Sequence, residues 1–527
     1  MPDIPGAPMP RAGHRNPDPA PPGRDGGLPR WMRLPLAVVA GVVMGLGQAP
    51  YELWFCGLAG LVAAFWLFRV SPRGGLAAGT GWAFGLGYFG FSMGWIVEPF
   101  LVDAAETGWM APFGVIGLAG GLALFWGLAF WGAARARRYA PAALVLSWTA
   151  AELARGYVLT GFPWANVSYL WLPTPVMQWA ALVGPYGLTA LTLALAALLA
   201  EAVPPAPRVR AGLAGGALGA VLLAAGWVLV PPLQALDGRP VVRLIQPNAP
   251  QDQKWDPDMV PVFFNRQVDY TEAPPAEGQE PPALILWSET ALPMLLHNAG
   301  DALGLISHVA GTAQVVIGIQ REDMGRWYNS LVLMDAEGDL AQVYDKHHLV
   351  PFGEYMPAAS LFARWNIAGL AARAEGGYSA GPGPQLLDLG PLGTALPLIC
   401  YEAVFPQDVH RAPARPEMLM QITNDAWFGQ FSGPYQHLAQ ARIRAIEQGL
   451  PMLRSANTGV SAVIDGAGRV LASLPLGEAG FLDAHLPPPL RMTPYARTGD
   501  LPVFLLIVLG AGCAVFTAWK GRARKSH

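Results

Sequence analysis

Long runs of hydrophobic positions alternate with short polar connections through the first half of the chain and return near its C-terminal end. Between Trp31 and Pro232, seven runs are long enough to cross a hydrocarbon core of about 30 Å. They cover residues 31–49, 51–69, 75–97, 110–133, 139–157, 175–201 and 211–231. An eighth run covers residues 500–519. The pattern predicts a polytopic α-helical membrane domain of eight transmembrane helices, with seven in residues 31–232.

Residues 240–490 have a different pattern, in which short apolar and β-branched runs lie between turn signals. Nine strands are predicted, at Val241–Gln246, Leu284–Trp287, Gln314–Gln320, Ser330–Asp335, Ala341–Tyr344, Leu396–Ile399, Met418–Thr423, Ser461–Ile464 and Val470–Ser473. Helical periodicity is predicted at Pro257–Glu272, Ala302–Gly311 and Tyr435–Gln448. This mixture, over about 250 residues, predicts a single α/β domain.

Composition supports a membrane protein. The chain is 53% hydrophobic and 13% charged, whereas soluble domains carry about 25% charged residues. The net charge of −3 offers no basic field for nucleic acid. Residues 1–30 are rich in Pro, Gly and Arg and have few large apolar side chains, so we expect a disordered tail rather than a signal peptide.

Basic residues mark alternate connections between the predicted spans. They occur before the first span and after the second, fourth and sixth, at Arg11, Arg15, Arg24, Arg30, Arg33, Arg69, Arg73, Arg135, Arg137, Arg138, Arg208 and Arg210. The positive-inside rule then places both termini in the cytoplasm, including a short tail at 520–527. Seven crossings place residues 240–490 on the outer side of the membrane.

Three segments of the α/β domain carry reactive side chains at predicted strand ends. Glu289 follows a buried strand, Lys346 follows a hairpin strand, and Cys400 ends the apolar run 396–399. Together they suffice for acyl transfer, because the carboxylate can take the thiol proton and the ammonium can stabilise the thiolate and the oxyanion. We found no zinc-like Cys/His spacing and no phosphate-cradling Gly-Lys motif, so we expect no metal and no cofactor.

These residues and their surroundings resemble the nitrilase (carbon–nitrogen hydrolase) superfamily, which has a Glu-Lys-Cys triad in this order. The resemblance is closer to its membrane branch, the apolipoprotein N-acyltransferase family, and extends from about residue 33 to about residue 519. It is carried by the motifs at Asp345–Tyr355, Ile399–Glu402, Thr423–Gly429, Gly433–Leu438 and Asn457–Ala462. One departure is Ser288, where many members have proline before the glutamate.

The resemblance implies an αββα nitrilase-like sandwich and a role for each triad residue. Glu289 would act as general base and then acid, Cys400 as nucleophile, and Lys346 with the backbone N–H of Tyr401 as the oxyanion hole. The family pattern also marks further residues around the active site, namely Trp255, Asn329, Glu354, Tyr401 and Glu402. For Glu354 and Glu402, structural support remains an alternative to a part in the chemistry. We interpret His347 as a surface histidine, and His348 and His437 as structural ones.

The resemblance further implies a ping-pong reaction at a bacterial inner membrane, with the catalytic domain in the periplasm. An acyl chain from the sn-1 position of a phospholipid, expected to be phosphatidylethanolamine, would pass through a Cys400 thioester. It would then reach the α-amino group of an S-diacylglyceryl-cysteine in an apolipoprotein. We expect a monomer whose partners are these substrates and membrane lipids. The alternatives are a membrane-anchored nitrilase-type amidase, and a transporter or scaffold with a degenerate nitrilase-like domain.

Overall fold

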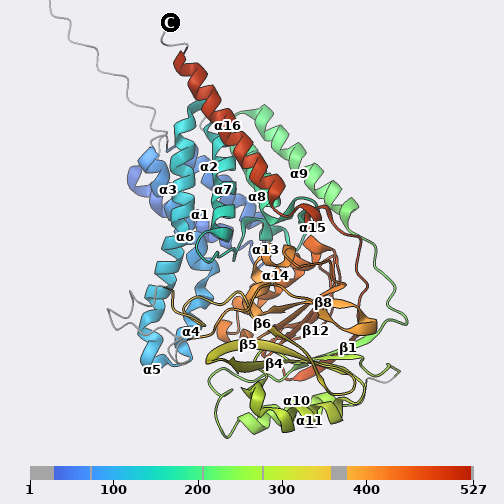
Figure 1. Ribbon diagram of the computed structural model, residues 1–527. Helices are drawn as coiled ribbons and strands as arrows, with labels where there is room; N and C mark the ends of the chain where they lie inside the picture. Colours follow the sequence, from blue (N-terminus) through green and yellow to red (C-terminus); the bar gives the residue numbers. More distant parts are fainter. Residues whose placement is uncertain (1–28, 72–73, 205–206, 276–277, 358–376, 524–527) are drawn as a thin grey trace, which may run out of the picture.

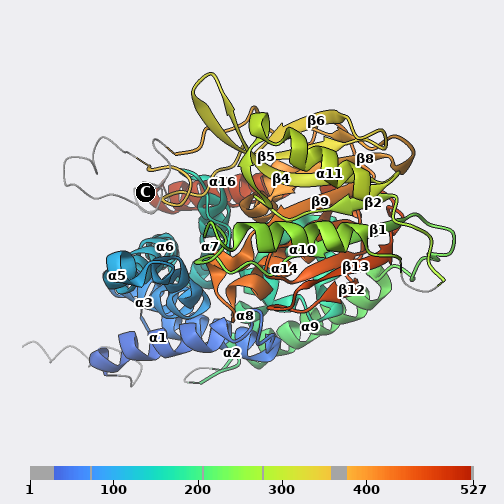
Figure 2. The same cartoon turned by 90° about the horizontal axis from the view of Figure 1, so that it is seen from below.

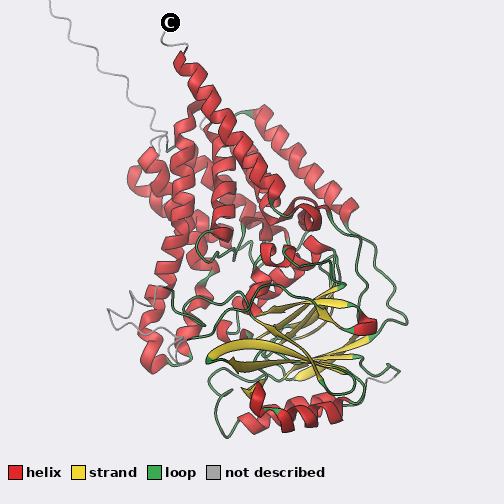
Figure 3. Cartoon of the chain, viewed as in Figure 1, coloured by secondary structure: helices red, strands yellow, loops and turns green. Residues whose placement is uncertain are grey.

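The computed structural model describes residues 29–71, 74–204, 207–275, 278–357 and 377–523, so most of the tail expected at 1–30 lies outside the described residues. Helices form one end of the molecule and two β-sheets form the other (Figures 1 and 3). The change from one to the other falls between the end of α9 at Leu229 and the start of β1 at Val241. The C-terminal helix returns alongside the other long helices (Figure 1).

Eight long helices lie over the eight predicted hydrophobic runs. They are α1 (Arg30–Gly45), α2 (Trp54–Arg69), α3 (Gly74–Ser92), α6 (Ala111–Ala133), α7 (Ala140–Tyr157), α8 (Ala180–Ala200), α9 (Val209–Leu229) and α16 (Leu501–Ala523). Between α3 and α6 lie the short elements η1 (Gly94–Val97), α4 (Glu98–Leu101), α5 (Ala104–Thr107) and η2 (Gly108–Met110). Between α7 and α8 lie η4 (Val167–Trp171) and η5 (Pro175–Trp179).

Among the described residues, three helical stretches are both long and apolar enough to cross a membrane: Ala104–Ala136, Pro175–Ala200 and Val209–Leu229. Shorter apolar helices cover Trp31–Gly45, Trp54–Arg69 and Leu501–Cys513. The helix α3 is rich in glycine, and α7 carries Glu152 and Arg155, which lowers the hydrophobicity of both. The eight-span membrane domain therefore stays a prediction.

The second part contains two stacked β-sheets. The first has the strand order β13-β1-β2-β4-β5-β6, with β3 paired to β4, and the second has the order β12-β11-β10-β9-β8-β7. The strands are β1 (Val241–Gln246), β2 (Leu284–Leu286), β3 (Leu292–Leu295), β4 (Gln314–Asp323), β5 (Arg326–Met334), β6 (Leu340–Asp345), β7 (Leu387–Asp388), β8 (Thr394–Ile399), β9 (Met418–Thr423), β10 (Met452–Ala456), β11 (Ser461–Ile464), β12 (Val470–Leu474) and β13 (Gly480–His485). In both sheets the central pairs are parallel and the outer pairs antiparallel.

Helices cover the outer face of each sheet, which gives the four layers of an αββα sandwich (Figures 1 and 2). On the first sheet lie α10 (Val260–Glu272) and α11 (Gly300–Ala310), and on the second lie α13 (Pro406–His410) and α14 (Gly433–Gln448). Strands such as β1 and β9 are buried along their whole length. This explains their unbroken apolar runs, since both faces of a central strand contact a core.

Most predicted elements of this domain are confirmed within a few residues, and β1, β9 and β11 have the predicted ends. The strands β10 and β13, and the short strands β3 and β7, were not predicted. The missed β10 contains Arg454, a residue type that normally lies at the surface. Here Arg454 is fully buried and pairs with Asp425 on the neighbouring segment.

The helix α14 connects the sandwich to the long helices. Ala439, Ile443 and Ile446 of α14 belong to the same hydrophobic core as the helical part. Gln436, at the start of α14, accepts hydrogen bonds from the indoles of Trp95 (3.2 Å) and Trp164 (2.7 Å). Its amide donates to the carbonyls of Ala49 (3.1 Å) and Ser92 (2.9 Å). The two parts therefore pack as one body through apolar contacts and a fully used polar side chain.

Candidate active site

Cys400 lies at the sharp turn between β8 and the short helix η9 (Cys400–Val404). Its φ of 51° is in the left-handed region, which is uncommon for a residue with a side chain. Such strain persists where the surrounding structure holds it, and it is concentrated at functional sites. The Cys400 side chain is buried beside residues of both sheets, with 5% of the residue exposed.

Glu289 follows β2 and is held at both carboxylate oxygens. Oε1 accepts a hydrogen bond from the amide of Asn329 (2.7 Å), and Oε2 accepts one from the backbone N–H of Asn424 (2.8 Å). The Glu289 turn lies directly against Gly318 of β4, where an added Cβ would be 2.7 Å from the Glu289 Cα. Glycine at 318 is therefore needed for this close approach.

Lys346 follows β6 and is buried, with 1% of its side chain exposed. Its Nζ lies 2.9 Å from Glu354 Oε1 and 3.4 Å from Glu289 Oε1. Burial lowers the pKa of Lys346, but the nearby carboxylates of Glu354 and Glu289 outweigh burial and raise that pKa above its usual value. The ammonium form is therefore the one present at neutral pH.

Asn329, on β5, joins the two carboxylates. Its amide donates to Glu289 at 2.7 Å and to Glu354 at 2.9 Å. The other oxygen of Glu354 accepts the backbone N–H of Val350 at 2.8 Å. Glu354 thus contacts both Lys346 and Asn329 and fixes the position of the ammonium group. This contact favours a positioning role for Glu354, which lies within the site as the sequence suggested.

The Cys400 thiol lies in an environment that disfavours its ionised form. Burial and the Glu289 carboxylate raise the pKa of Cys400 well above its usual value, and the Lys346 ammonium only partly opposes them. A thiol in this state needs a base at the moment of attack, because the thiolate is the nucleophile. Glu289 is the nearby carboxylate whose negative charge acts on that thiol.

The contacts of Lys254 with Glu289 and Thr290 were not predicted from the sequence. Lys254 lies before α10. Lys254 is buried, and its Nζ donates to the Glu289 carbonyl (3.0 Å) and to the Thr290 hydroxyl (2.8 Å). Burial lowers its pKa to about 8, against the opposing charge of Glu289. Only the neighbouring Trp255 was named from the sequence. Trp255 is 43% exposed, and its ring centroid lies 5.9 Å from Lys254 Nζ. It therefore lies at the exposed edge of this group of residues.

Tyr401 and Glu402 directly follow Cys400 and make most of their contacts outside the Glu289–Lys346 pair. Glu402 is fully buried and accepts hydrogen bonds from the backbone N–H groups of Ile399 (2.7 Å) and His347 (2.8 Å) and from the Tyr344 hydroxyl (2.9 Å). These contacts make it a support for the nucleophile turn. The Tyr401 hydroxyl lies 3.4 Å from the Gly161 carbonyl between α7 and α8, so its side chain contacts the helical part.

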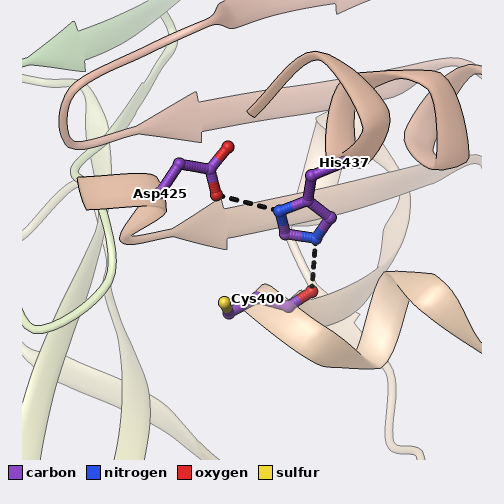
Figure 4. A group of neighbouring side chains, drawn as sticks. All are labelled: Cys400, Asp425 and His437. Atoms are coloured by element: carbon purple, nitrogen blue, oxygen red, sulfur yellow. Dashed lines mark hydrogen bonds and ion pairs between the residues drawn. The ribbon is translucent and has the colours of Figure 1, made fainter. Parts of the chain in front are cut away.

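Behind Cys400, Asp425 and His437 form a buried network (Figure 4). His437 Nδ1 lies 2.8 Å from Asp425, and its Nε2 lies 3.1 Å from the Cys400 carbonyl and 2.9 Å from the Gln421 amide. Burial lowers the pKa of His437, which favours a neutral ring that donates to Asp425 and accepts from Gln421.

The side-chain donor atoms of Cys400, Asp425 and His437 lie within 4.8 Å of one another, close enough for a metal ion. Each imidazole nitrogen already has a protein partner, however, and Asp425 is paired with Arg454. Gln421 also donates to the Cys400 carbonyl at 3.1 Å, so the group has the hydrogen-bond pattern of a support for the nucleophile backbone. We therefore interpret His437 as a structural histidine.

An aromatic wall separates this network from the long helices. The Phe428 ring lies 5.5 Å from the His437 ring, 4.8 Å from Trp95 and 5.5 Å from Trp164. Cys400 therefore lies at the junction of the sandwich and the apolar helices. Phe428 packs against the hydrophobic cores of both parts.

Comparison with known proteins agrees with both halves of the structure. The apolipoprotein N-acyltransferase N-terminal domain matches residues 40–198, and the carbon–nitrogen hydrolase family matches residues 269–493. Among solved structures, a CN-hydrolase superfamily protein from Xanthomonas campestris is 20% identical, with a TM-score of 0.34, over 47% of this chain and 90% of that one.

Curated relatives match over nearly the whole chain. The apolipoprotein N-acyltransferase of Rhodopseudomonas palustris is 38% identical over 91% of this chain and 94% of its own length. That of Bradyrhizobium diazoefficiens is also 38% identical, over 94% of this chain and 96% of its own. The chain therefore belongs to the apolipoprotein N-acyltransferase family, and it is an acyltransferase.

Proposed function

We propose that this acyltransferase moves a fatty acyl chain from a phospholipid to the N-terminal α-amino group of an S-diacylglyceryl-cysteine in an apolipoprotein. The observation that carries the proposal is the position of Cys400. It lies beside Glu289 and Lys346 and, through Phe428, against a core shared with the apolar helices. A nucleophile at that junction suits substrates that are themselves held in a lipid layer.

In the first half-reaction, Glu289 accepts the Cys400 proton as sulfur attacks the carbonyl carbon of the sn-1 ester. The tetrahedral oxyanion is stabilised by the Lys346 ammonium and the backbone N–H of Tyr401. Collapse breaks the ester C–O bond, and the protonated Glu289 gives its proton to the leaving alkoxide. The products are lysophospholipid and an acyl-thioester on Cys400. Phosphatidylethanolamine is the donor that we propose.

In the second half-reaction, the acceptor's neutral amine attacks the thioester carbonyl. Glu289 takes a proton from the amine, the C–S bond breaks, and the thiol is restored. Water is the competing nucleophile, and an enclosed, water-poor site favours the amine. The burial of Cys400, Glu289 and Lys346 supports this selectivity. The ester is already an activated acyl donor, so the two steps need no energy source beyond it.

We further propose a bacterial inner-membrane location with both termini in the cytoplasm and residues 240–490 in the periplasm. The alternating arginines support this orientation. So does the grouping of both sheets at one end of the long helices, opposite the end of α16 (Figure 1). Fusions of alkaline phosphatase at Gly238 and at the C-terminus test it, since only the first should be active. The reverse result would overturn the orientation.

The central experiment uses the purified full-length protein in detergent. It is incubated with phosphatidylethanolamine labelled in the sn-1 chain and with a diacylated lipopeptide. We expect labelled N-acyl peptide and lysophospholipid in equal amounts, and an acyl adduct on Cys400 when the acceptor is omitted. Cys400→Ala should abolish all three, whereas the matched variant Cys56→Ala should retain them. Amide hydrolysis without acyl transfer would instead support the amidase alternative.

A further inference from the structure

A cavity of about 200 Å³ lies between the helical part and the sandwich, next to the site described above. Its walls come from the turn between α1 and α2, from the end of α3 with η1 and α4, and from the segment around η10 (Asp425–Phe428). A closed apolar cavity of about 150 Å³ is large enough to hold benzene. The space therefore suffices for a small organic group.

The lining combines several aromatic rings with one carboxylate. The residues that matter are Tyr51, Phe91, Trp95, Phe428, Phe431 and Glu98. Tyr51 stacks on Phe91 with ring centroids 5.5 Å apart and meets Phe431 edge to face at 5.8 Å. An alkylammonium group is attracted to aromatic faces, and most strongly where a carboxylate lies close by.

Glu98 is held at this cavity without a counter-ion among the described residues. None of them forms a hydrogen bond or an ion pair with its carboxylate. The carboxyl group packs on Gly429, where an added Cβ would lie 2.5 Å from the Glu98 Cδ. Gly429 has a φ of 70°, so a side chain there is disfavoured by both backbone and space. An unpaired carboxylate beside aromatic rings can pair with a cation that the rings also attract.

The cavity lies next to the end of a predicted membrane span and close to the backbone of Cys400. Glu98 follows directly after the third predicted span, at residues 75–97. Phe428 lines the cavity on one side and contacts the ring of His437 on the other. His437 lies 3.1 Å from the carbonyl of Cys400. One aromatic side chain and one imidazole therefore separate the cavity from the nucleophile backbone.

We propose that Glu98 and these aromatic rings bind the alkylammonium headgroup of the phospholipid acyl donor, either a primary or a quaternary amine. This rests on the proposed function and adds a determinant of donor choice. Tyr51 and Phe431 are 38% and 61% exposed, which leaves the cavity accessible from outside the fold.

The test compares three donors with identical acyl chains: phosphatidylethanolamine, phosphatidylcholine and phosphatidylglycerol. For Glu98→Gln we expect KM to rise about tenfold for the two ammonium lipids and to stay unchanged or fall for phosphatidylglycerol. Glu106→Gln, an exposed carboxylate on the neighbouring α5, is the matched control and should behave as the wild type. An equal loss with all three donors would overturn the proposal, since it would indicate an effect on the acceptor or on folding. No change with any donor would also overturn it.

A second measurement separates this proposal from the proposed function. The Cys400→Ser variant is used to remove thiol chemistry, and its binding of each lipid in detergent micelles is measured by native mass spectrometry. Preferential binding of ammonium lipids that is lost with Glu98→Gln supports the headgroup site, even if the wild type transfers no acyl chain to a lipopeptide. Equal binding of the three lipids by Cys400→Ser contradicts the headgroup site and leaves the acyl-transfer assay to decide the function.

Discussion

Glu402 accepts a hydrogen bond of 2.7 Å from the backbone N–H of Ile399, the residue directly before the nucleophile. Its other oxygen accepts the backbone N–H of His347 at 2.8 Å. One buried carboxylate therefore ties the Cys400 turn to the segment that follows Lys346. The two reactive residues, 54 positions apart in the sequence, are placed relative to each other through this side chain.

Replacing Glu402 by Gln should disturb this arrangement. An amide keeps one acceptor but presents an N–H to one of two backbone donors, and a buried unsatisfied donor costs about 1–3 kcal/mol. We expect a lower unfolding temperature and a kcat reduced about tenfold or more, with KM little changed. Thermal unfolding and steady-state kinetics measure these effects. Glu337→Gln, in an exposed hairpin turn, is the control. A Glu402→Gln protein with wild-type stability and kcat would contradict the role.

His347 was predicted to lie at the surface, but its side chain is only 13% exposed because it packs against Glu402, and it should make stability depend on pH. Burial lowers its pKa, but Glu402 at 2.6 Å and Asp408 at 3.7 Å outweigh burial and raise the pKa to about 9. A raised pKa means that the protonated form is favoured in the folded state. The stabilisation is full below the unfolded value of about 6.5 and is lost as pH rises through about 9.

The difference in unfolding temperature between wild type and His347→Gln should therefore shrink between pH 6.5 and pH 9.5. The exposed His308 of α11 provides the control, because His308→Gln removes a histidine without these partners. A difference between wild type and His347→Gln that stays constant over this range would show that the charged form of His347 adds nothing to folding.

That Glu289, Lys346 and Cys400 lie together could be predicted from the sequence, whereas their catalytic roles stay a proposal. Each of the three follows a strand, and strand ends meet at one edge of a sandwich. Lys254 could not be found in this way. A lysine in a polar segment is typical of the surface. Its burial follows from the fold, which brings Glu289 to it across 35 positions.

The Glu98 cavity is a second feature that sequence reasoning could not reach. Its walls come from segments more than 300 positions apart, and no local pattern records that they meet. Arg454 shows the same limit for strands. A charged residue argues against a buried strand, and only the structure reveals that Asp425 pairs with Arg454 and so permits β10. In both cases the missing information is which distant segments of the chain meet.

Lys254 is expected to act through the position of Glu289. Lys254→Met keeps the length of the side chain but removes the hydrogen bonds to the Glu289 carbonyl and the Thr290 hydroxyl. Thr290 has a φ of 44°, so its turn is strained and relaxes when it is not held. We expect kcat to fall about tenfold to a hundredfold, because a small misplacement of a catalytic group has effects of this size.

Thr290→Val provides the graded comparison, since it removes one of the two Lys254 contacts and keeps the other. Its kcat should lie between those of the wild type and Lys254→Met, and KM for both substrates should change little. If Lys254→Met instead raised KM for one substrate at constant kcat, Lys254 would contact that substrate and would not position Glu289.

Glu289 and Lys346 should shift the titration of Cys400 in opposite directions. The Glu289 carboxylate raises the pKa of the Cys400 thiol and the Lys346 ammonium lowers it, while burial holds it above its usual value. Glu289→Gln should therefore lower the pKa of Cys400, and Lys346→Met should raise it. Both variants should lose acyl transfer, because one lacks the base and the other lacks the oxyanion cation.

The rate of Cys400 alkylation by iodoacetamide as a function of pH measures this shift, in a Cys56→Ala and Cys513→Ala background that leaves one thiol. In the wild type the alkylation rate of Cys400 should still be rising above pH 9. In Glu289→Gln the same rise in alkylation rate should occur at lower pH. Faster alkylation combined with lost turnover would separate thiolate formation from catalysis, since the proton must also be delivered to the leaving alkoxide. A Glu289→Gln curve displaced to higher pH would mean that the carboxylate stabilises the thiolate, and the base assigned to Glu289 would have to be sought elsewhere.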